Sequence, residues 1–173
     1  LIDILMGNKE YADIVLLNGN VINVITREVY KADIAIKDKY ILLVGDCREL
    51  IGPDTLAIDV EGKYLSPGFI DSHTEFSRLS IPSGTTTLVA DPHEIGNALG
   101  LIGMKAMADE IDHVPNNVYL VVPALTPDSP DLETAGCDIS SKDMEDILSY
   151  KNIIGIGELQ GFSNAKHVYR NTP

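Results

Sequence analysis

The chain has 173 residues, and its 13 Lys and Arg against 26 Asp and Glu give a formal net charge of −13. So acidic a chain repels phosphate backbones, which excludes nucleic-acid binding through a basic face. Hydrophobic residues make up 45% of the chain, enough for a packed core, so global disorder is excluded as well.

Membrane-spanning and secreted proteins are also disfavoured. The longest apolar runs, such as Val118–Val122, are far too short to cross a bilayer, and no basic region followed by an apolar stretch opens the chain. Cys47 and Cys137 lie far apart and lack metal-binding spacing, so we interpret them as reduced thiols. We therefore expect a cytoplasmic protein without membrane or nucleic-acid partners. Because the first residue is not Met, we also expect the true start to lie upstream.

Short strands and tight turns fill the first third of the chain. Apolar runs on both sides of Asn18-Gly19 predict a hairpin between residues 12–17 and 21–25. A second hairpin is predicted around Lys37-Asp38-Lys39, and a third around Glu61-Gly62. So many short strands favour a small sandwich-like β domain, which we place at residues 1–65.

From Ser66 onward, apolar strands alternate with helical patterns. Strands are expected at 69–71, 85–90, 117–123 and 153–157, and helices at 95–107 and 141–150. Strands that are apolar throughout indicate a parallel sheet covered by helices, here over residues 66–173. A closed (β/α)8 barrel needs eight such strands and roughly 250 residues. We therefore expect a piece of a larger polypeptide, with completion by a second copy as the alternative.

Three polar segments follow expected strands, at the strand ends where α/β barrels build active sites. Asp71-Ser72-His73 supplies a histidine that is either structural or functional. Asp91-Pro92-His93-Glu94 fits a capping box from Asp91 to Glu94, with Pro92 as the first helical residue. Glu158, after Gly155-Ile156-Gly157, either begins a loop or points its carboxylate into a barrel mouth to bridge two metal ions.

His93 is left outside this capping box, at the start of the expected helix. The helix dipole there favours the neutral imidazole, the form that binds metals or hydrogen-bonds to a substrate. His113 and His167 have no partner at ligand spacing, so we interpret them as surface or loop residues. The acidic residues 128–133 are interpreted as solvated surface.

Taken together, these segments resemble the adenine deaminases of the amidohydrolase superfamily. Ser66–His73 resembles the superfamily's entry into its first barrel strand, which any amidohydrolase shares. More specific are Pro82–Thr87 leading to Ala90–Asn97, because Val122–Ala124, Glu133–Gly136 and Gly155–Glu158 then follow in the order that adenine deaminases show. Residues 12–19 and 32–36 resemble the family's amino-terminal β domain.

The resemblance implies an amidohydrolase-type (β/α)8 TIM barrel, of which about the first half is present, and a small N-terminal β-sandwich normally completed by C-terminal strands. It implies hydrolysis of the small-molecule purine adenine to hypoxanthine and ammonia by metal-activated water, in a binuclear manganese, iron or zinc site. His73 would be a metal ligand and Glu158 a bridging, catalytic carboxylate. Asp91, His93 and Glu94 would bind the substrate. The exposed edges of a half-barrel also favour a homo-oligomer.

The chain departs from the family's pattern after His73. The superfamily ends its first strand with two metal-binding histidines as His-x-His, whereas Thr74-Glu75 follow here. Residues 74–78 align with the start of the family's later helix, so we expect about ten residues to be absent after His73. Further metal-binding histidines and an aspartate belong to later strands, so these 173 residues alone are not expected to complete the metal site.

Two alternatives remain open. Another cyclic amidohydrolase, of dihydropyrimidinase or deacetylase type, also fits the entry into the first barrel strand. A catalytically inactive, truncated scaffold fits the incomplete set of metal ligands. An assay of ammonia release from adenine and an assay of hydantoin ring opening would distinguish the deaminase from the other cyclic amidohydrolases. Stoichiometric transition metal in the purified protein would exclude the inactive scaffold.

Overall fold

The computed structural model describes residues 10–74, 78–124, 126–127 and 134–158. The chain divides into two compact units, Leu1–Pro67 and Gly68–Pro173, and each is described by itself. Among the helices of the described segments, none is long and apolar enough to cross a membrane.

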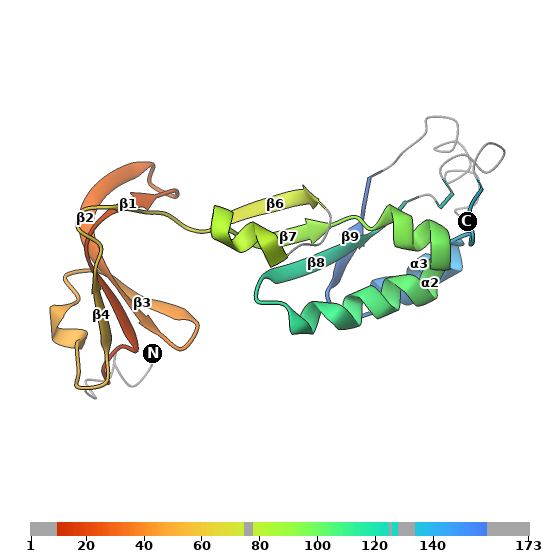
Figure 1. The fold of residues 1–173 in the computed structure, drawn as a ribbon. Helices are drawn as coiled ribbons and strands as arrows, with labels where there is room; N and C mark the ends of the chain where they lie inside the picture. The colour runs from red at the N-terminus through yellow and green to blue at the C-terminus, as the bar shows by residue number, and fades with distance from the viewer. Residues whose placement is uncertain (1–9, 75–77, 125, 128–133, 159–173) are drawn as a thin grey trace. The chain divides into compact units, whose positions relative to one another are not determined.

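The first unit contains one five-stranded sheet within the described residues (Figure 1). Its strands are β1 (Ile14–Asn23), β2 (Glu28–Lys37), β3 (Tyr40–Gly45), β4 (Leu56–Asp59) and β5 (Tyr64–Leu65), and a short 3-10 helix, η1 (Arg48–Leu50), follows β3. The order is β3-β2-β1-β4, and β5 also pairs with β1. The hairpin predicted around Asp38 is confirmed, since β2 and β3 pair antiparallel and Asp38 has a φ of 51°.

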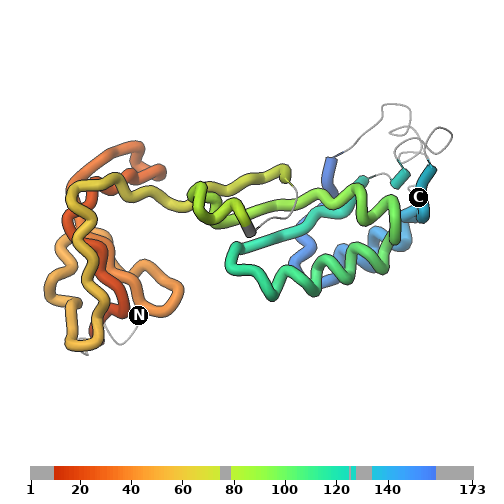
Figure 2. The backbone as a smooth tube through the Cα atoms, in the orientation of Figure 1, coloured from red at the N-terminus to blue at the C-terminus, as the bar shows by residue number. Residues whose placement is uncertain are grey.

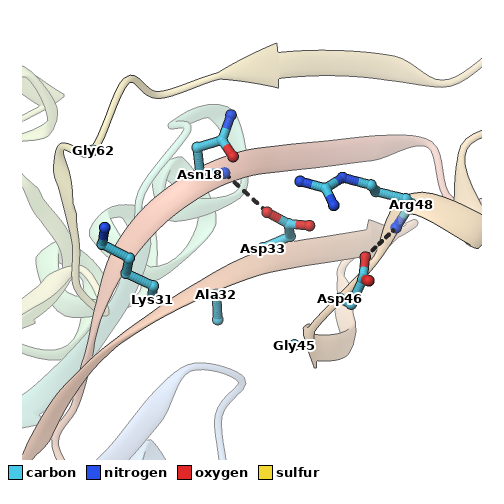
Figure 3. A pocket seen from close by; sticks show the side chains of 8 residues that line it. All are labelled: Asn18, Lys31, Ala32, Asp33, Gly45, Asp46, Arg48 and Gly62. Atoms are coloured by element: carbon cyan, nitrogen blue, oxygen red, sulfur yellow. Dashed lines mark hydrogen bonds between the residues drawn. The ribbon is translucent and has the colours of Figure 1, made fainter.

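The hairpin predicted at Asn18-Gly19 is wrong, because β1 continues straight through these residues. The pairing of β1 with β2 shifts register between Leu16 and Gly19, and Asn18 has a φ of 59°. This β-bulge is held by the Asn18 backbone N–H, which donates to Asp33 Oδ1 at 2.9 Å (Figure 3). The chain turns later, where Arg27 has a φ of 61° and its N–H donates to the Asn23 carbonyl.

The third hairpin is also wrong in its pairing, although its strands and its turn exist. Glu61 and Gly62 form the turn with φ values of 54° and 75°. However, β4 and β5 pair in parallel with β1 on either side of the bulge, and not with each other. The Gly62 N–H donates to the Asn18 carbonyl, so the turn crosses β1 at the bulge. The bulge thus separates the part of β1 that pairs with β4 from the part that pairs with β5.

A small cluster of buried side chains forms the core of this unit. Val15, Ala35 and Cys47 are fully buried together with Ala12. Cys47 and Cys137 are both free thiols, as predicted. Burial, followed by the nearby charge of Asp33, raises the pKa of the Cys47 thiol.

The second unit contains a parallel sheet in chain order, β6-β7-β8-β9, within the described residues. Its strands are β6 (Phe69–Thr74), β7 (Thr85–Ala90), β8 (Asn117–Val122) and β9 (Ile153–Ile156). Helices α2 (His93–Glu110) and α3 (Ser141–Leu148) run beside β8 and β9, and η2 (Arg78–Ser83) and η3 (Ile111–His113) are short 3-10 helices (Figures 1 and 2). The predicted alternation of strands and helices is therefore confirmed.

Helices cover one face of this sheet. Alternate strand residues are buried against the helices: Leu88, Ala90, Val118, Leu120 and Val122 pack with Met104 and Ala108 of α2 and with Ile147 of α3. The side chains between them, Val89, Tyr119 and Val121, are partly or largely exposed. In the described residues, this second face of the sheet has no helical layer.

Helix α2 is interrupted, which its sequence pattern did not predict. Gly100 has a φ of 57° and a ψ of −139°, so the chain makes two helical segments there. The carbonyl of Asn97, in the first segment, accepts hydrogen bonds from the backbone N–H groups of Gly136 and Cys137 at 2.8 and 3.1 Å. A loop distant in sequence therefore ends the first segment.

Candidate active site

Polar side chains follow three strands of the parallel sheet, at its carboxyl edge. His73 is the second-to-last residue of β6, Asp91 and His93 follow β7, and Glu158 follows β9. His73 Nε2 and Glu158 Oε2 are 3.6 Å apart, and their side chains are 63% and 52% exposed. The structure thus brings together the two residues predicted to bind metal.

This contact requires a curved sheet. His73 and Glu158 belong to the two outer strands, and β7 and β8 lie between them. Three strand spacings of about 4.8 Å would separate β6 and β9 by roughly 14 Å in a flat sheet. A register shift between Asp71 and Thr74 also places both Ser72 and His73 opposite Val89. Such a bulge redirects side chains, here at the end of β6.

The capping box predicted from Asp91 to Glu94 is wrong. In the described residues, α2 begins at His93 after Pro92, and the start has no side-chain cap. The carboxylate of Asp91 instead reaches β9, where its Oδ2 accepts a hydrogen bond from the Glu158 backbone N–H at 2.7 Å. The same Oδ2 lies 3.4 Å from His93 Nε2. A partner 67 residues away therefore competes successfully with the local cap.

Gly157 makes this contact possible. A Cβ atom at this position would overlap the Asp91 carboxylate, with the Asp91 Cγ at 2.5 Å. The Gly157 N–H donates to the Val122 carbonyl at 2.7 Å, which fixes the backbone of β9 against β8 at the same point. Sequence reasoning overlooked Gly157, although a glycine directly before the acidic residue was the available signal.

The remaining candidates divide between exposed and undescribed positions. Glu94 is exposed in the first turn of α2, where a negative charge stabilises the helix dipole. His113 is exposed in η3, which agrees with its interpretation as a surface residue. His167 and residues 128–133 lie outside the described residues.

The donor set fits part of a metal site. Imidazole and carboxylate ligands suit manganese, iron and zinc, and His73 with Glu158 offers one of each. Among the residues that the structure describes, no group of three or more His, Cys, Asp or Glu side chains is placed to hold a metal ion. Further ligands would have to come from elsewhere in the polypeptide.

Comparison with known proteins gives close relatives. No profile of a known protein family matches the chain. A protein of Carboxydothermus hydrogenoformans named "Adenine deaminase 1" is 66% identical over the whole chain, which covers 30% of that protein. "Adenine deaminase 3" of Rhizobium meliloti is 43% identical over 94% of the chain, which covers 29% of that protein. The chain therefore spans under a third of the length of these relatives.

These alignments are longer than the chain segments that they match. The first runs over 184 residues, 11 more than the 173 of this chain. The second runs over 174 residues, and 94% of 173 is about 163, again a difference of about 11. The relatives thus carry additional residues inside the matched region. Their number agrees with the segment predicted to be absent after His73.

Solved structures show the fold. A β-aspartyl dipeptidase from Fervidobacterium islandicum matches with a TM-score of 0.59 over 84% of this chain and 40% of its own, at 20% identity. A D-hydantoinase from a Thermus species matches with a TM-score of 0.58 at 23% identity, over 84% of this chain and 35% of its own. At such identities the likeness supports the α/β fold of the amidohydrolases and nothing finer.

Proposed function

Because this chain belongs by sequence to the adenine deaminase family, we propose that it carries part of the active site of an enzyme that hydrolyses adenine to hypoxanthine and ammonia. The observation that carries the proposal is the approach of His73 to Glu158, at 3.6 Å, from the two outer strands of the sheet. An imidazole and a carboxylate at one carboxyl edge form the start of a metallohydrolase site.

We propose further that the second unit is about half of a (β/α)8 barrel. Parallel strands in chain order, a sheet curved enough for side chains from its outer strands to meet, and helices on one face all support this architecture. The face bearing Val89, Tyr119 and Val121 would then line the barrel interior. The small β domain at residues 1–65 would be a sandwich completed by C-terminal strands.

In this proposal the His73 imidazole would hold a divalent metal ion, and the Glu158 carboxylate would be the bridging ligand of a binuclear site. When bound, manganese, iron or zinc would activate water as a nucleophile at neutral pH. His93 and Glu94, at the start of α2, would help to bind and orient the purine.

Water attacks C6 of adenine and the bond from C6 to the exocyclic amino nitrogen breaks. The amino group leaves as ammonia after gaining a proton that comes from the attacking water. Glu158 is the catalytic carboxylate among the described residues. We also propose a cytoplasmic protein that forms a homo-oligomer. The oligomer is supported by the outer strands β6 and β9, which in these 173 residues alone would present unpaired backbone groups.

The test uses the intact protein and its Glu158→Gln variant. Deamination of adenine is followed by ammonia release, ring opening of hydantoin serves as the competing activity, and bound metal is measured by mass spectrometry. We expect deamination and stoichiometric metal in the wild type, and loss of both in Glu158→Gln. Glu145→Gln, at an exposed position of α3, is the matched control and should change neither. Retained deamination in Glu158→Gln would remove the bridging role.

A further inference from the structure

We propose that Asp91 is a positioning residue, which holds the Glu158 backbone and the His93 imidazole in place for the reaction. The inference rests on the proposed function, which it deepens, and it assigns Asp91 a different task from the substrate contact expected from sequence. Four observations on neighbouring residues support it.

The first observation is burial. The side chain of Asp91 is only 2% exposed, whereas those of His73 and Glu158 are more than half exposed. A buried carboxylate needs donors around it, because removing its charge from water is costly. Its Oδ2 is engaged with the Glu158 N–H and lies near the His93 ring. This oxygen therefore faces protein groups and not the open mouth of the site.

The second observation is the path of the contact. Asp91 follows β7 and Glu158 follows β9, so the hydrogen bond between them passes across the end of β8. One residue earlier, the Gly157 N–H donates a hydrogen bond to the carbonyl of Val122 in β8. The backbone that carries Glu158 is thus fixed from two strands. Its carboxylate then leaves this backbone in the direction of His73.

The third observation is a second attachment. The same Asp91 oxygen lies 3.4 Å from His93 Nε2. One carboxylate therefore contacts both His93, which is proposed to bind substrate, and the backbone of Glu158, which is proposed to bind metal. In metal sites, a carboxylate that hydrogen-bonds to a ligand histidine fixes the orientation of the imidazole ring, and its loss typically costs about 10- to 100-fold in metal affinity or activity. We expect an effect of similar size from the contact of Asp91 with His93.

The fourth observation is that residue 157 is a glycine. Any side chain there would push the Asp91 carboxylate away from the Glu158 N–H. Gly155, two residues earlier on β9, provides a matched comparison. A Cβ atom at Gly155 would meet no described atom within 4 Å. Replacement by alanine is therefore expected to disturb the Asp91 contact at Gly157 but not at Gly155.

The experiment measures adenine turnover, bound metal and backbone amide exchange at Glu158 in the intact protein. Asp91→Ala and Gly157→Ala should each lower kcat by about 10- to 100-fold, with a smaller change in KM, and should speed exchange at the Glu158 amide. Asp91→Asn keeps an oxygen for that amide and should retain slow exchange and more activity than Asp91→Ala. Gly155→Ala should behave as wild type.

A double variant supplies the sharpest comparison. In Asp91→Ala the obstacle to a Cβ atom at residue 157 is gone, so adding Gly157→Ala should cause little further loss. Additive losses would overturn the proposal, as would wild-type kcat in Gly157→Ala, or a raised KM at unchanged kcat in Asp91→Ala. If Asp91→Ala does not fold, Gly157→Ala and Asp91→Asn still decide the question by the same measurements.

Amide exchange separates this inference from the proposed function. If the wild type does not deaminate adenine, the proposed function fails. Faster exchange at Glu158 in Asp91→Ala and Gly157→Ala, but not in Gly155→Ala, would still support the positioning contact. Unchanged exchange in an active enzyme would refute the contact and leave the deaminase in place.

Discussion

Replacing Asp33 with alanine should destabilise the first unit through the bulge in β1. Asp33 is 6% exposed, and its two carboxylate oxygens serve two separate backbone segments. Oδ1 accepts from the Asn18 N–H at 2.9 Å, and Oδ2 accepts from the Cys47 N–H at 3.3 Å. Figure 3 shows the carboxylate beside Asn18, in a pocket that Arg48 also lines. One side chain thus holds both the bulge and the end of β3.

The expected loss of stability follows from these two bonds. A buried donor left without its partner costs about 1–3 kcal/mol. The hydrogen bond from the Cys47 N–H is long, and the Asn18 N–H can hydrogen-bond to water in the adjoining pocket instead. The cost of losing each of these two hydrogen bonds therefore belongs in the lower half of that range. We therefore expect Asp33→Ala to lower the free energy of unfolding by about 2–4 kcal/mol. Asp33→Asn keeps one acceptor oxygen and should lose about half as much.

Urea denaturation of the intact protein, followed by circular dichroism, measures this loss. Asp46→Ala is the control, because Asp46 is exposed and its hydrogen bond from the Arg48 N–H is long, at 3.3 Å. The control should stay within about 0.5 kcal/mol of wild type. Amide exchange at Asn18 and Cys47 should accelerate in Asp33→Ala. Equal stability of Asp33→Ala and Asp46→Ala, with both amides still protected, would refute the reasoning.

Three further substitutions test the second unit in the intact protein. Leu120→Ala empties a fully buried position between the sheet and its helices, and should cost about 3–5 kcal/mol in urea denaturation; a loss below 1 kcal/mol would contradict the assigned core. Ser140→Ala removes the capping box that Ser140 forms with Asp143 at the start of α3, and should cost about 0.5–2 kcal/mol, visible as faster amide exchange in the first turn of α3; Lys142→Ala is its control. Lys151→Gln removes the hydrogen bond and charge that hold the pKa of Asp112 below its usual value of 3.8. Since a lowered carboxyl pKa contributes stability above the unfolded value and loses it as the pH falls through the folded value, wild type should be slightly more stable than Lys151→Gln at pH 7. The difference should vanish once the pH is below the lowered pKa of Asp112. A difference in stability that persists in strong acid would show that the pair acts by packing and not by charge.

Three of the four strands of the second unit could be predicted almost to the residue, whereas β6 runs three residues beyond the predicted 69–71. Strand β7 occupies the predicted residues 85–90, and β8 and β9 each end one residue early. Parallel strands buried by helices are uninterrupted apolar runs, so composition alone reveals them. In the first unit the strands were found, but two of three pairings were wrong. Asn18 supplies a positive φ for a bulge as readily as for a turn, and only the distant Asp33 decides between them.

The candidate site shows the same division between local and distant information. His73 and Glu158 could be selected because each follows a strand, and parallel strands share one carboxyl edge. Asp91 was assigned to a capping box because Asp91 and Glu94 have the right local spacing. Its actual partner is the backbone of Glu158, and no local pattern records a bond between residues so far apart. Gly157, which has no side chain to attract notice, was missed for the same reason.

The break in α2 has a consequence for how the site can vary during evolution. The segment before Gly100 carries His93 and Glu94 and ends on the loop at Gly136, whereas the segment after it supplies Met104 to the core. The residues proposed to face the substrate thus lie on a different helical segment from Met104, although Ile95 of the first segment also packs against the core. Substitutions near residue 136 are therefore expected to shift the segment that carries His93 and Glu94 more than the segment that carries Met104.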